Sequence, residues 1–385
     1  PSWQHRRLLA ASGAPRASAG MVRILTYNVH SCIGRDGKYD VQRVADAIAR
    51  ADVDLVCLQE AEVNSKPRKV RTYSAKHADN QPELLARATG LRNVSFSGPL
   101  CAYEGEYKRG CCEDQFDEVL TRDWECTSGL GNAVLSKYEI LDSRSLVFDG
   151  SKEGLSEQHI YMDREPVPRG ARAVLINLDS MPFLPGVKSA EEGEAGQEAT
   201  MAVEKQGLGA SRAYTSCCRA PSAKSPESKK KPDSRALLWV VSTQLSHKLC
   251  CEEQREQAKQ LITWVDGLAG EKFPGDKLSV VICGDFNAPP FAPCSSYSAL
   301  SSGDGWADLW KENGTWCNQS TSPVAFGSCC PTALGTRRDH IFALQRDGLT
   351  KVSCDRICIA EEGVASLHCP VMVDLKMDGA KKYII

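Results

Sequence analysis

The sequence predicts a layered α/β sandwich, in which β-sheets pack face to face and helices cover them. Short apolar segments rich in β-branched residues, which are typical of strands, outnumber the helical segments along the chain. The few helical segments carry their apolar residues on one face only, as helices that cover a sheet do. Apolar residues make up 42% of the chain, enough for a sizeable core, and no apolar run is long enough to predict a transmembrane helix.

The first elements alternate between strand and helix. Residues 24–29 form an apolar, β-branched run that predicts a strand ending near Asn28. Apolar residues then recur at helical spacing after Asp40, which is a good helix N-cap. Residues 53–58 predict a second buried strand, which leads directly into Glu60.

A second helix is predicted between Asn80, as its N-cap, and Gly90, where it stops. Leu84 and Leu85 are expected to face the core. Residues 98–127 are polar, aromatic and cysteine-rich without a clear period, so the first part of this segment is expected to be a long surface loop.

The remainder of the chain predicts one long helix and several more strands. The helix covers residues 252–268 and has a continuous apolar face. The strands are expected at residues 131–135, 171–178, 237–245, 278–283, 339–344 and 368–375.

Length and local composition predict one interrupted domain. At about 150 residues per domain, 385 residues suggest two or three domains. However, residues of about 182–234 are polar and of low complexity, with a run of three lysines, and predict a disordered insertion. The expected domain therefore covers residues 21–378, preceded by a disordered leader at 1–20 and followed by a tail at 379–385. The leader is rich in Arg, Ser and Ala and either belongs to an organelle transit peptide or precedes a true start at Met21.

Charge and cysteine content limit the function and the location. The formal net charge is −2, so the chain has no general attraction for nucleic acids or anionic membranes, and any polyanion must be bound locally. The 18 cysteines are too sparse for a disulfide scaffold, which favours a reduced, intracellular and cytoplasmic protein, with organelle targeting by residues 1–20 left open. Four adjacent cysteine pairs raise the alternative of a zinc-organised module, although none belongs to a paired CxxC set.

Polar side chains recur at the ends of the predicted strands, where they are costly unless they face a cleft. They comprise two carboxamides, three carboxylates and one imidazole: Asn28, Glu60, Asp285, Asn287, Asp339 and His368. Carboxylates suit a hard cation, carboxamides bind an oxyanion or hold a water, and an Asp and a His can pair. Together they predict metal-assisted phosphoester hydrolysis.

Five ordered motifs resemble the endonuclease/exonuclease/phosphatase superfamily, whose members have the DNase I-like fold. The motifs are LTYNVH at 25–30, VCLQE at 56–60, ICGDFN at 282–287, RDHIF at 338–342 and SLHCPV at 366–371. The resemblance implies a four-layered α/β sandwich of two packed, mainly antiparallel β-sheets flanked by helices. It also implies a divalent-metal-dependent phosphoesterase that hydrolyses a phosphodiester or phosphomonoester by in-line attack of an activated water.

The same resemblance implies roles for individual residues. Glu60 would bind Mg²⁺, or Mn²⁺ in its place, and Asn28 would lie close to both the metal and the phosphate. Asp285 would orient or deprotonate the attacking water, and Asn287 would hold that water or a phosphoryl oxygen. This division agrees with the needs of in-line attack, namely a positioned water, a base and donors to the non-bridging oxygens.

His368, paired with Asp339, would contact the phosphate as charge builds. Two departures from the family pattern stand beside these matches. Gln244, a substrate-binding candidate, occupies a position where a second histidine is common, and it cannot carry a proton at neutral pH. His247 lies on the opposite face of an extended strand and is a poor substitute. Leu367 replaces an aspartate that can support a metal.

The expected partner is a phosphoester: a nucleic acid, a nucleotide or a phospholipid headgroup. The near-neutral charge weakens the case for a nonspecific DNA nuclease, which profits from a basic face. Endonuclease, exonuclease and phosphatase activity all stay open, and the chain is expected to act as a monomer. The alternative is a catalytically weakened binding or scaffold protein, which the departures at Gln244 and Leu367 motivate.

Overall fold

The structure is a computed structural model, and the part of the chain that it describes is interrupted. The described residues are 21–63, 77, 79–103, 106–108, 128–148, 169–180, 234–246, 252–290, 295–303, 305–310, 337–344, 349–356 and 365–377. The predicted leader, tail and insertion lie outside these ranges, except for Ser234, and so do the four adjacent cysteine pairs. No helix within the described ranges has the length and apolarity that a membrane span requires.

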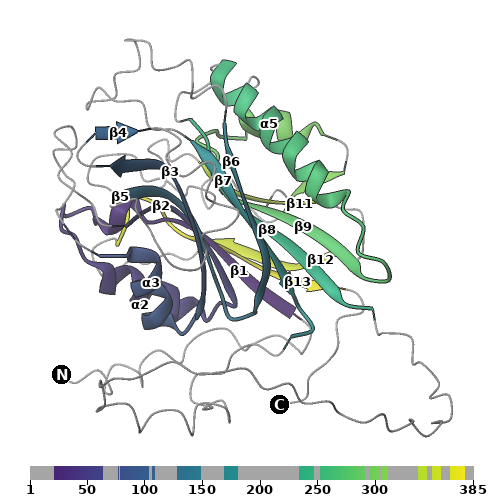
Figure 1. Cartoon of the computed structure of the whole chain (residues 1–385), viewed down its shortest axis with the longest axis horizontal. Coiled ribbons are helices and arrows are strands. Elements are labelled where there is room, and N and C mark those ends of the chain that lie inside the picture. Colours follow the sequence, from purple (N-terminus) through teal and green to yellow (C-terminus); the bar gives the residue numbers. More distant parts are fainter. Residues whose placement is uncertain are drawn as a thin grey trace, which may run out of the picture. The chain divides into compact units, whose positions relative to one another are not determined.

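The described strands form two mixed sheets (Figure 1). The seven-stranded sheet has the order β12-β13-β1-β2-β5-β3-β4. Its strands are β1 Met21–Asn28, β2 Leu55–Val63, β3 Asn93–Tyr103, β4 Glu106–Lys108, β5 Ser128–Ser136, β12 Leu349–Arg356 and β13 Val371–Met377. Within it, β1 and β2 are parallel and the other neighbours are antiparallel.

The six-stranded sheet has the order β10-β11-β9-β8-β7-β6. Its strands are β6 Ile140–Val147, β7 Gly170–Asn177, β8 Ala236–Gln244, β9 Lys277–Asp285, β10 Trp306–Asp308 and β11 Asp339–Leu344. Here β8 and β9 are parallel, and the other pairs are antiparallel. The expectation of two mainly antiparallel sheets is confirmed.

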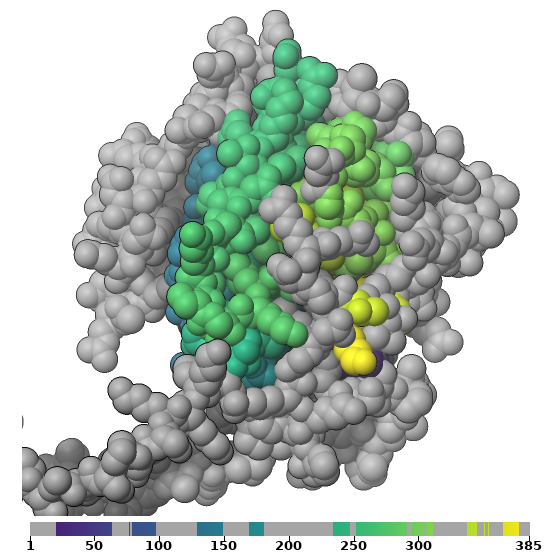
Figure 2. All heavy atoms as spheres, turned by 90° about the vertical axis from the view of Figure 1, so that its right-hand side faces the viewer, coloured from purple at the N-terminus to yellow at the C-terminus, as the bar shows by residue number. Residues whose placement is uncertain are grey.

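Helices cover the outer face of each sheet, which gives four layers. Helices α2 (Val41–Ala51) and α3 (Gln81–Thr89) pack on the seven-stranded sheet, and α5 (Glu252–Ala269) and α6 (Ser296–Ser301) pack on the six-stranded sheet. Figure 1 shows α2 and α3 on one side of the two sheets and α5 on the other. Figure 2 shows α5 lying along the outer face of its sheet, beside the segment that contains α6. A third cluster of buried apolar side chains fills the space between the sheets.

Alternation along each strand divides its side chains between two of these layers. In β8, Leu237, Trp239 and Val241 pack under α5, whereas Leu238 and Val240 face the other sheet. Both sets are fully buried, which is why the strand reads as a continuous apolar run. The even-numbered residues further along β8 therefore also face the layer between the sheets.

The predicted starts of α2 and α3 and the predicted end of α3 are confirmed. The Asp40 side chain accepts a hydrogen bond from the backbone of α2. The Asn80 side chain accepts one from α3, and Gly90 ends α3 in the left-handed conformation, with φ 78°. Leu85 is fully buried, as expected, but the expectation for Leu84 is wrong because its residue is 37% exposed.

The expected loop at residues 98–127 is wrong in its first part. Strand β3 continues to Tyr103 and pairs with β5 past an irregularity between Ser97 and Leu100, and β4 then pairs with β3. The other elements without a prediction are β6, β10, β12, α6 and the single-turn helix η2 (His30–Cys32). The strands among them are sheet edges, which depend on pairing with distant strands, and local periodicity does not report such pairing.

Candidate active site

The layer between the sheets changes from apolar to polar at one edge. The carboxyl ends of the parallel strands β8 and β9 meet there, and the antiparallel strand β11 begins there. Consequently Gln244, Asp285 and Asp339 are direct register partners across three neighbouring strands. In the other sheet, Asn28 ends β1 at the same edge. All four residues are buried.

Glu60 reaches this edge through a bulge in β2. The register with β5 shifts between Leu58 and Ala61, so one extra residue is accommodated in β2. Glu60 itself has φ 54°, a left-handed conformation that is costly for a residue with a side chain. The bulge breaks the simple alternation of β2, and the Glu60 carboxylate meets Asn28 and Gln244.

The end of β9 and the turn that follows it are equally constrained. Gly284 lies so close to β8 that a Cβ would be 2.0 Å from the carbonyl oxygen of Thr243, so only glycine fits. Asn287 has φ 51°, its backbone N–H donates to Asp285 Oδ1 at 3.0 Å, and its Nδ2 donates to the Leu245 carbonyl at 3.0 Å. These contacts fix the orientation of both side chains.

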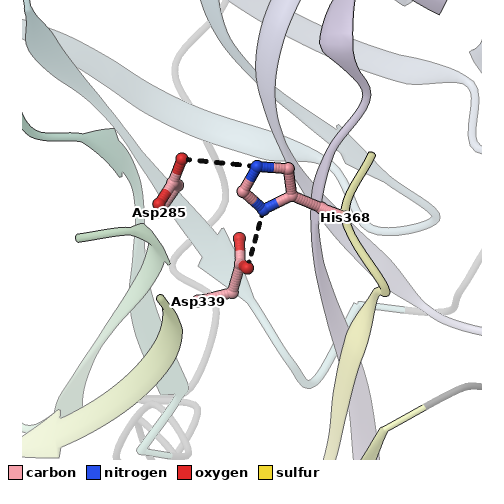
Figure 3. Close-up of side chains that lie close together, drawn as sticks. All are labelled: Asp285, Asp339 and His368. Atoms are coloured by element: carbon pink, nitrogen blue, oxygen red, sulfur yellow. Dashed lines mark hydrogen bonds and ion pairs between the residues drawn. The ribbon is translucent and has the colours of Figure 1, made fainter. Parts of the chain in front are cut away.

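His368 lies between two carboxylates (Figure 3). Its Nδ1 is 2.9 Å from Asp339 Oδ2, and its Nε2 is 3.9 Å from Asp285 Oδ2. The chain just before His368 is held in place because the Ser366 hydroxyl donates to the Asn28 carbonyl at 2.6 Å and accepts from the His368 N–H. The imidazole is therefore anchored to both sheets.

Two amides bridge the remaining carboxylates. Asn28 Nδ2 donates to Glu60 Oε1 at 3.1 Å and to Asp285 Oδ2 at 3.0 Å. Gln244 Nε2 donates to the same two oxygens, at 2.6 and 3.4 Å. The carbonyl oxygen of the Gln244 amide accepts a hydrogen bond from Arg169. Each amide thus has one defined orientation, with its NH₂ group toward the carboxylates.

Burial and mutual charge shift the acidities within the site. Burial raises the pKa of Asp285, and the neighbouring carboxylates Asp339 and Glu60 add to the increase, while His368 opposes it. Burial alone would lower the pKa of His368, but the charges of Asp339 and Asp285 outweigh it and raise that pKa to about 9. An imidazolium between carboxylates results at neutral pH.

All the site residues named from the sequence lie in one hydrogen-bonded and ion-paired network at this edge: Asn28, Glu60, Gln244, Asp285, Asn287, Asp339 and His368. Leu367 is 39% exposed, and His247 lies outside the described residues. Sequence reasoning did not find Arg169, which immediately precedes β7. The sequence could have indicated Arg169, because a strand antiparallel to its neighbours contributes its first residues, not its last, to the edge where those neighbours end.

The donor set fits a hard divalent cation. Asp285, Asp339 and His368 offer ligand atoms that all lie within 4.8 Å of one another, and they are the group in the described ranges that could hold a metal ion. The Glu60 carboxylate lies next to this group, linked to Asp285 through Asn28. Carboxylate and carboxamide oxygens are ligands that Mg²⁺ accepts, whereas the described site contains no cysteine ligand of the kind that zinc prefers.

Two packed sheets between helices carry acids, amides and a histidine at one shared edge, a set of groups that suits metal-assisted phosphoester chemistry. A model of the endonuclease/exonuclease/phosphatase family matches residues 25–343. The chain belongs to this family, whose members generally hydrolyse phosphoester bonds with a divalent metal. No curated protein matches the chain by sequence.

Solved structures support the fold. The chain is similar to an endonuclease/exonuclease/phosphatase from Beutenbergia cavernae DSM 12333, with a TM-score of 0.57 and 18% identity over 94% of this chain and 72% of that one. It is also similar to a protein of the same description from Bacteroides vulgatus, with a TM-score of 0.53 and 15% identity over 93% and 99% of the two chains. At such identities the likeness concerns the fold alone.

Proposed function

We propose that this protein is a Mg²⁺-dependent phosphoesterase that hydrolyses a phosphodiester or phosphomonoester by attack of a water molecule. The observation that carries the proposal is the His368 imidazole held between Asp339 and Asp285, next to the Glu60 carboxylate. This arrangement supplies a base, a positively charged donor and a carboxylate for a metal within one network, which are the groups that in-line attack on phosphorus requires.

Glu60 and Asn28 are the residues we propose at the metal: Glu60 is the carboxylate ligand, and Asn28 lies beside it, with its NH₂ group holding Glu60 Oε1 and its oxygen accepting from the His30 N–H. Both ring nitrogens of His368 already face carboxylates, at 2.9 and 3.9 Å, which leaves Glu60 as the carboxylate outside that ion-paired group. A bound Mg²⁺ would neutralise charge on the phosphoryl oxygens and on the leaving group. Mn²⁺ accepts the same oxygen ligands and can replace Mg²⁺ in the assay.

The remaining residues act on water and phosphate. Asp285 accepts the proton of the attacking water, a role to which its raised pKa suits it, because a base works best when its pKa lies nearer the operating pH. Asn287 holds that water or a phosphoryl oxygen, and Gln244 donates a hydrogen bond to the phosphate. His368, oriented by Asp339, contacts the phosphate as negative charge builds.

The substrate class remains a phosphoester of a nucleic acid, a nucleotide or a phospholipid headgroup, bound by a monomer. The proposed location is reducing and intracellular, and the free, buried thiols of Cys32 and Cys57 are compatible with it. The alternative function is a binding or scaffold protein. The bridging Gln244 amide favours it, because this amide occupies the Glu60 oxygen with a donor that carries no proton between groups.

The deciding experiment combines turnover with metal binding. Wild-type protein is assayed with Mg²⁺ and with chelator on single-stranded DNA, RNA, nucleotides, phosphoinositides and sphingomyelin, and Mg²⁺ binding is measured by calorimetry. Glu60→Gln is expected to lose both Mg²⁺ binding and hydrolysis, and His368→Gln hydrolysis alone. Glu83→Gln, on the exposed face of α3, is the matched control and should retain both. Mg²⁺-dependent hydrolysis at the wild-type rate in Glu60→Gln would overturn the proposal, and absent turnover in every wild-type assay would favour the scaffold.

A further inference from the structure

Arg169 lies at the side of the site opposite His368. It immediately precedes β7, and Gly170, the first residue of β7, pairs in register with Gln244 of β8. Gln244 in turn pairs with Asp285 of β9, and Asp285 with Asp339 of β11. At about 4.8 Å between neighbouring strands, the backbone at Gly170 lies about 10 Å from that of Asp285. The guanidinium crosses part of this interval to reach the Gln244 amide.

The backbone beneath Arg169 is held from several directions. The Gly170 carbonyl accepts hydrogen bonds from Asn132 Nδ2 at 2.9 Å, across the layer between the sheets, and from the Thr243 hydroxyl at 3.1 Å. The Arg169 carbonyl accepts from the Phe148 N–H at 3.1 Å. A Cβ on Gly170 would lie 2.3 Å from a backbone oxygen of β6, so only glycine allows the two strands to approach this closely. The backbone that carries the Arg169 side chain is therefore held in one position.

The side chain is oriented as firmly as its backbone. The Gln244 oxygen accepts from Arg169, and the Gln244 NH₂ group donates to Glu60 and Asp285. Reversing this amide would direct its NH₂ group at a guanidinium and its oxygen at two carboxylates, so only one orientation is stable. Gln244 thus holds a permanent positive charge one amide group away from Glu60.

The charges of the site favour a cation on the side of β7, in addition to a bound metal. Three carboxylates, Glu60, Asp285 and Asp339, converge on this edge, and each of them repels an incoming phosphate. His368 offsets this repulsion on the side of β11. Arg169 is the cation that the described site holds on the side of β7, and a guanidinium matches two phosphoryl oxygens with two parallel N–H groups.

We infer that Arg169 is a substrate-binding residue, which contacts the phosphoryl group on the side opposite His368 and is positioned for that contact by Gln244. The inference rests on the proposed function, because it assumes a phosphoester in this site. It also explains the glutamine at position 244: a histidine there would be a donor toward Arg169 whenever it is charged, whereas the Gln244 oxygen accepts from Arg169 at any pH.

The test uses inorganic phosphate as the probe, with the full chain and saturating Mg²⁺, in a calorimetric or ³¹P NMR titration. Arg169→Ala is expected to weaken phosphate binding at least tenfold, and Arg169→Lys, which keeps the charge but loses the two-point contact, to weaken it about threefold. Arg87→Ala on α3, whose side chain is 76% exposed, is the matched control and should bind phosphate as the wild type does. Denaturation midpoints establish that each variant is folded.

Turnover separates this inference from the proposed function. On any phosphoester that the wild type hydrolyses, Arg169→Ala should raise KM by tenfold or more, and millimolar guanidinium should restore part of the lost rate. Phosphate binding that depends on Arg169, in a protein without turnover, would sustain the inference and remove the proposed function. Wild-type affinity in Arg169→Ala would overturn the inference, as would a folded wild type that binds no phosphate. If Arg169→Ala does not fold, Arg169→Lys decides in the same way.

Discussion

Replacing Asp339 with asparagine should remove the charge that keeps His368 protonated. The two side chains have nearly the same shape, so the substitution changes charge more than packing. In the metal-free wild type the pKa of His368 is raised from 6.5 to about 9, although burial alone would lower it. A rise of this size corresponds to roughly 3 kcal/mol in favour of the imidazolium, at about 1.36 kcal/mol per pKa unit.

The distances show how this stabilisation is divided. Asp339 lies 2.9 Å from one ring nitrogen of His368, and Asp285 lies 3.9 Å from the other. At an effective dielectric constant of about 20, these distances give attractions of about 6 and about 4 kcal/mol. Because Asp339 contributes the larger share and burial continues to oppose protonation, Asp339→Asn should lower the pKa of His368 by at least about 2 units.

The measurement is a pH titration of ¹³C-labelled histidines by NMR in the presence of chelator. The chain has seven histidines, and a His368→Gln spectrum identifies the signal in question. Asp46→Asn, on α2 at the outer face of the other sheet, controls for the loss of one negative charge elsewhere. A pKa for His368 that stays above about 8 in Asp339→Asn would refute the reasoning. Hydrolysis at pH 8 should fall by about 10²-fold or more in the same variant.

Three further predictions concern stability. Gly284→Ala should lower the free energy of unfolding, measured by urea denaturation, by about 3 kcal/mol, because the added Cβ would lie 2.0 Å from a backbone oxygen of β8. As a control, Gly267→Ala in α5 adds a Cβ that meets nothing within 4 Å and should be neutral or stabilising. Equal denaturation midpoints for the two variants would contradict this prediction. Asp308→Ala should cost about 3–5 kcal/mol, because it leaves the buried Arg337 guanidinium without its ion pair, and a loss below about 1 kcal/mol would contradict the ion pair's importance. The pKa of His368 is higher in the folded than in the unfolded protein, so His368 stabilises the fold fully below pH 6.5 and loses this contribution as the pH rises through about 9. In the presence of chelator, the free energy of unfolding of His368→Gln should therefore fall less between pH 6 and 9.5 than that of the wild type.

Much of the architecture could be predicted from short segments. The apolar runs identified β1, β2, β7, β8, β9 and β11, because strands buried on both faces are apolar throughout. Asp40 and Asn80 identified the starts of α2 and α3, because capping is a local hydrogen bond between a side chain and the next turn of backbone. Short or edge strands such as β6, β10 and β12 were not predicted, because their pairing with distant strands decides them.

The sequence by itself determined which polar residues end the buried strands, since a carboxylate after an apolar run is conspicuous wherever the chain goes. Only the tertiary structure decided how they meet. Asp339 opposes Asp285 through strand register, and the β2 bulge brings Glu60 to Asn28. Arg169 reaches the site because β7 is antiparallel to β8, so that its beginning lies at the edge where β8 ends. Register, bulges and strand direction arise from contacts between segments far apart in the chain, and no local pattern of residues encodes them.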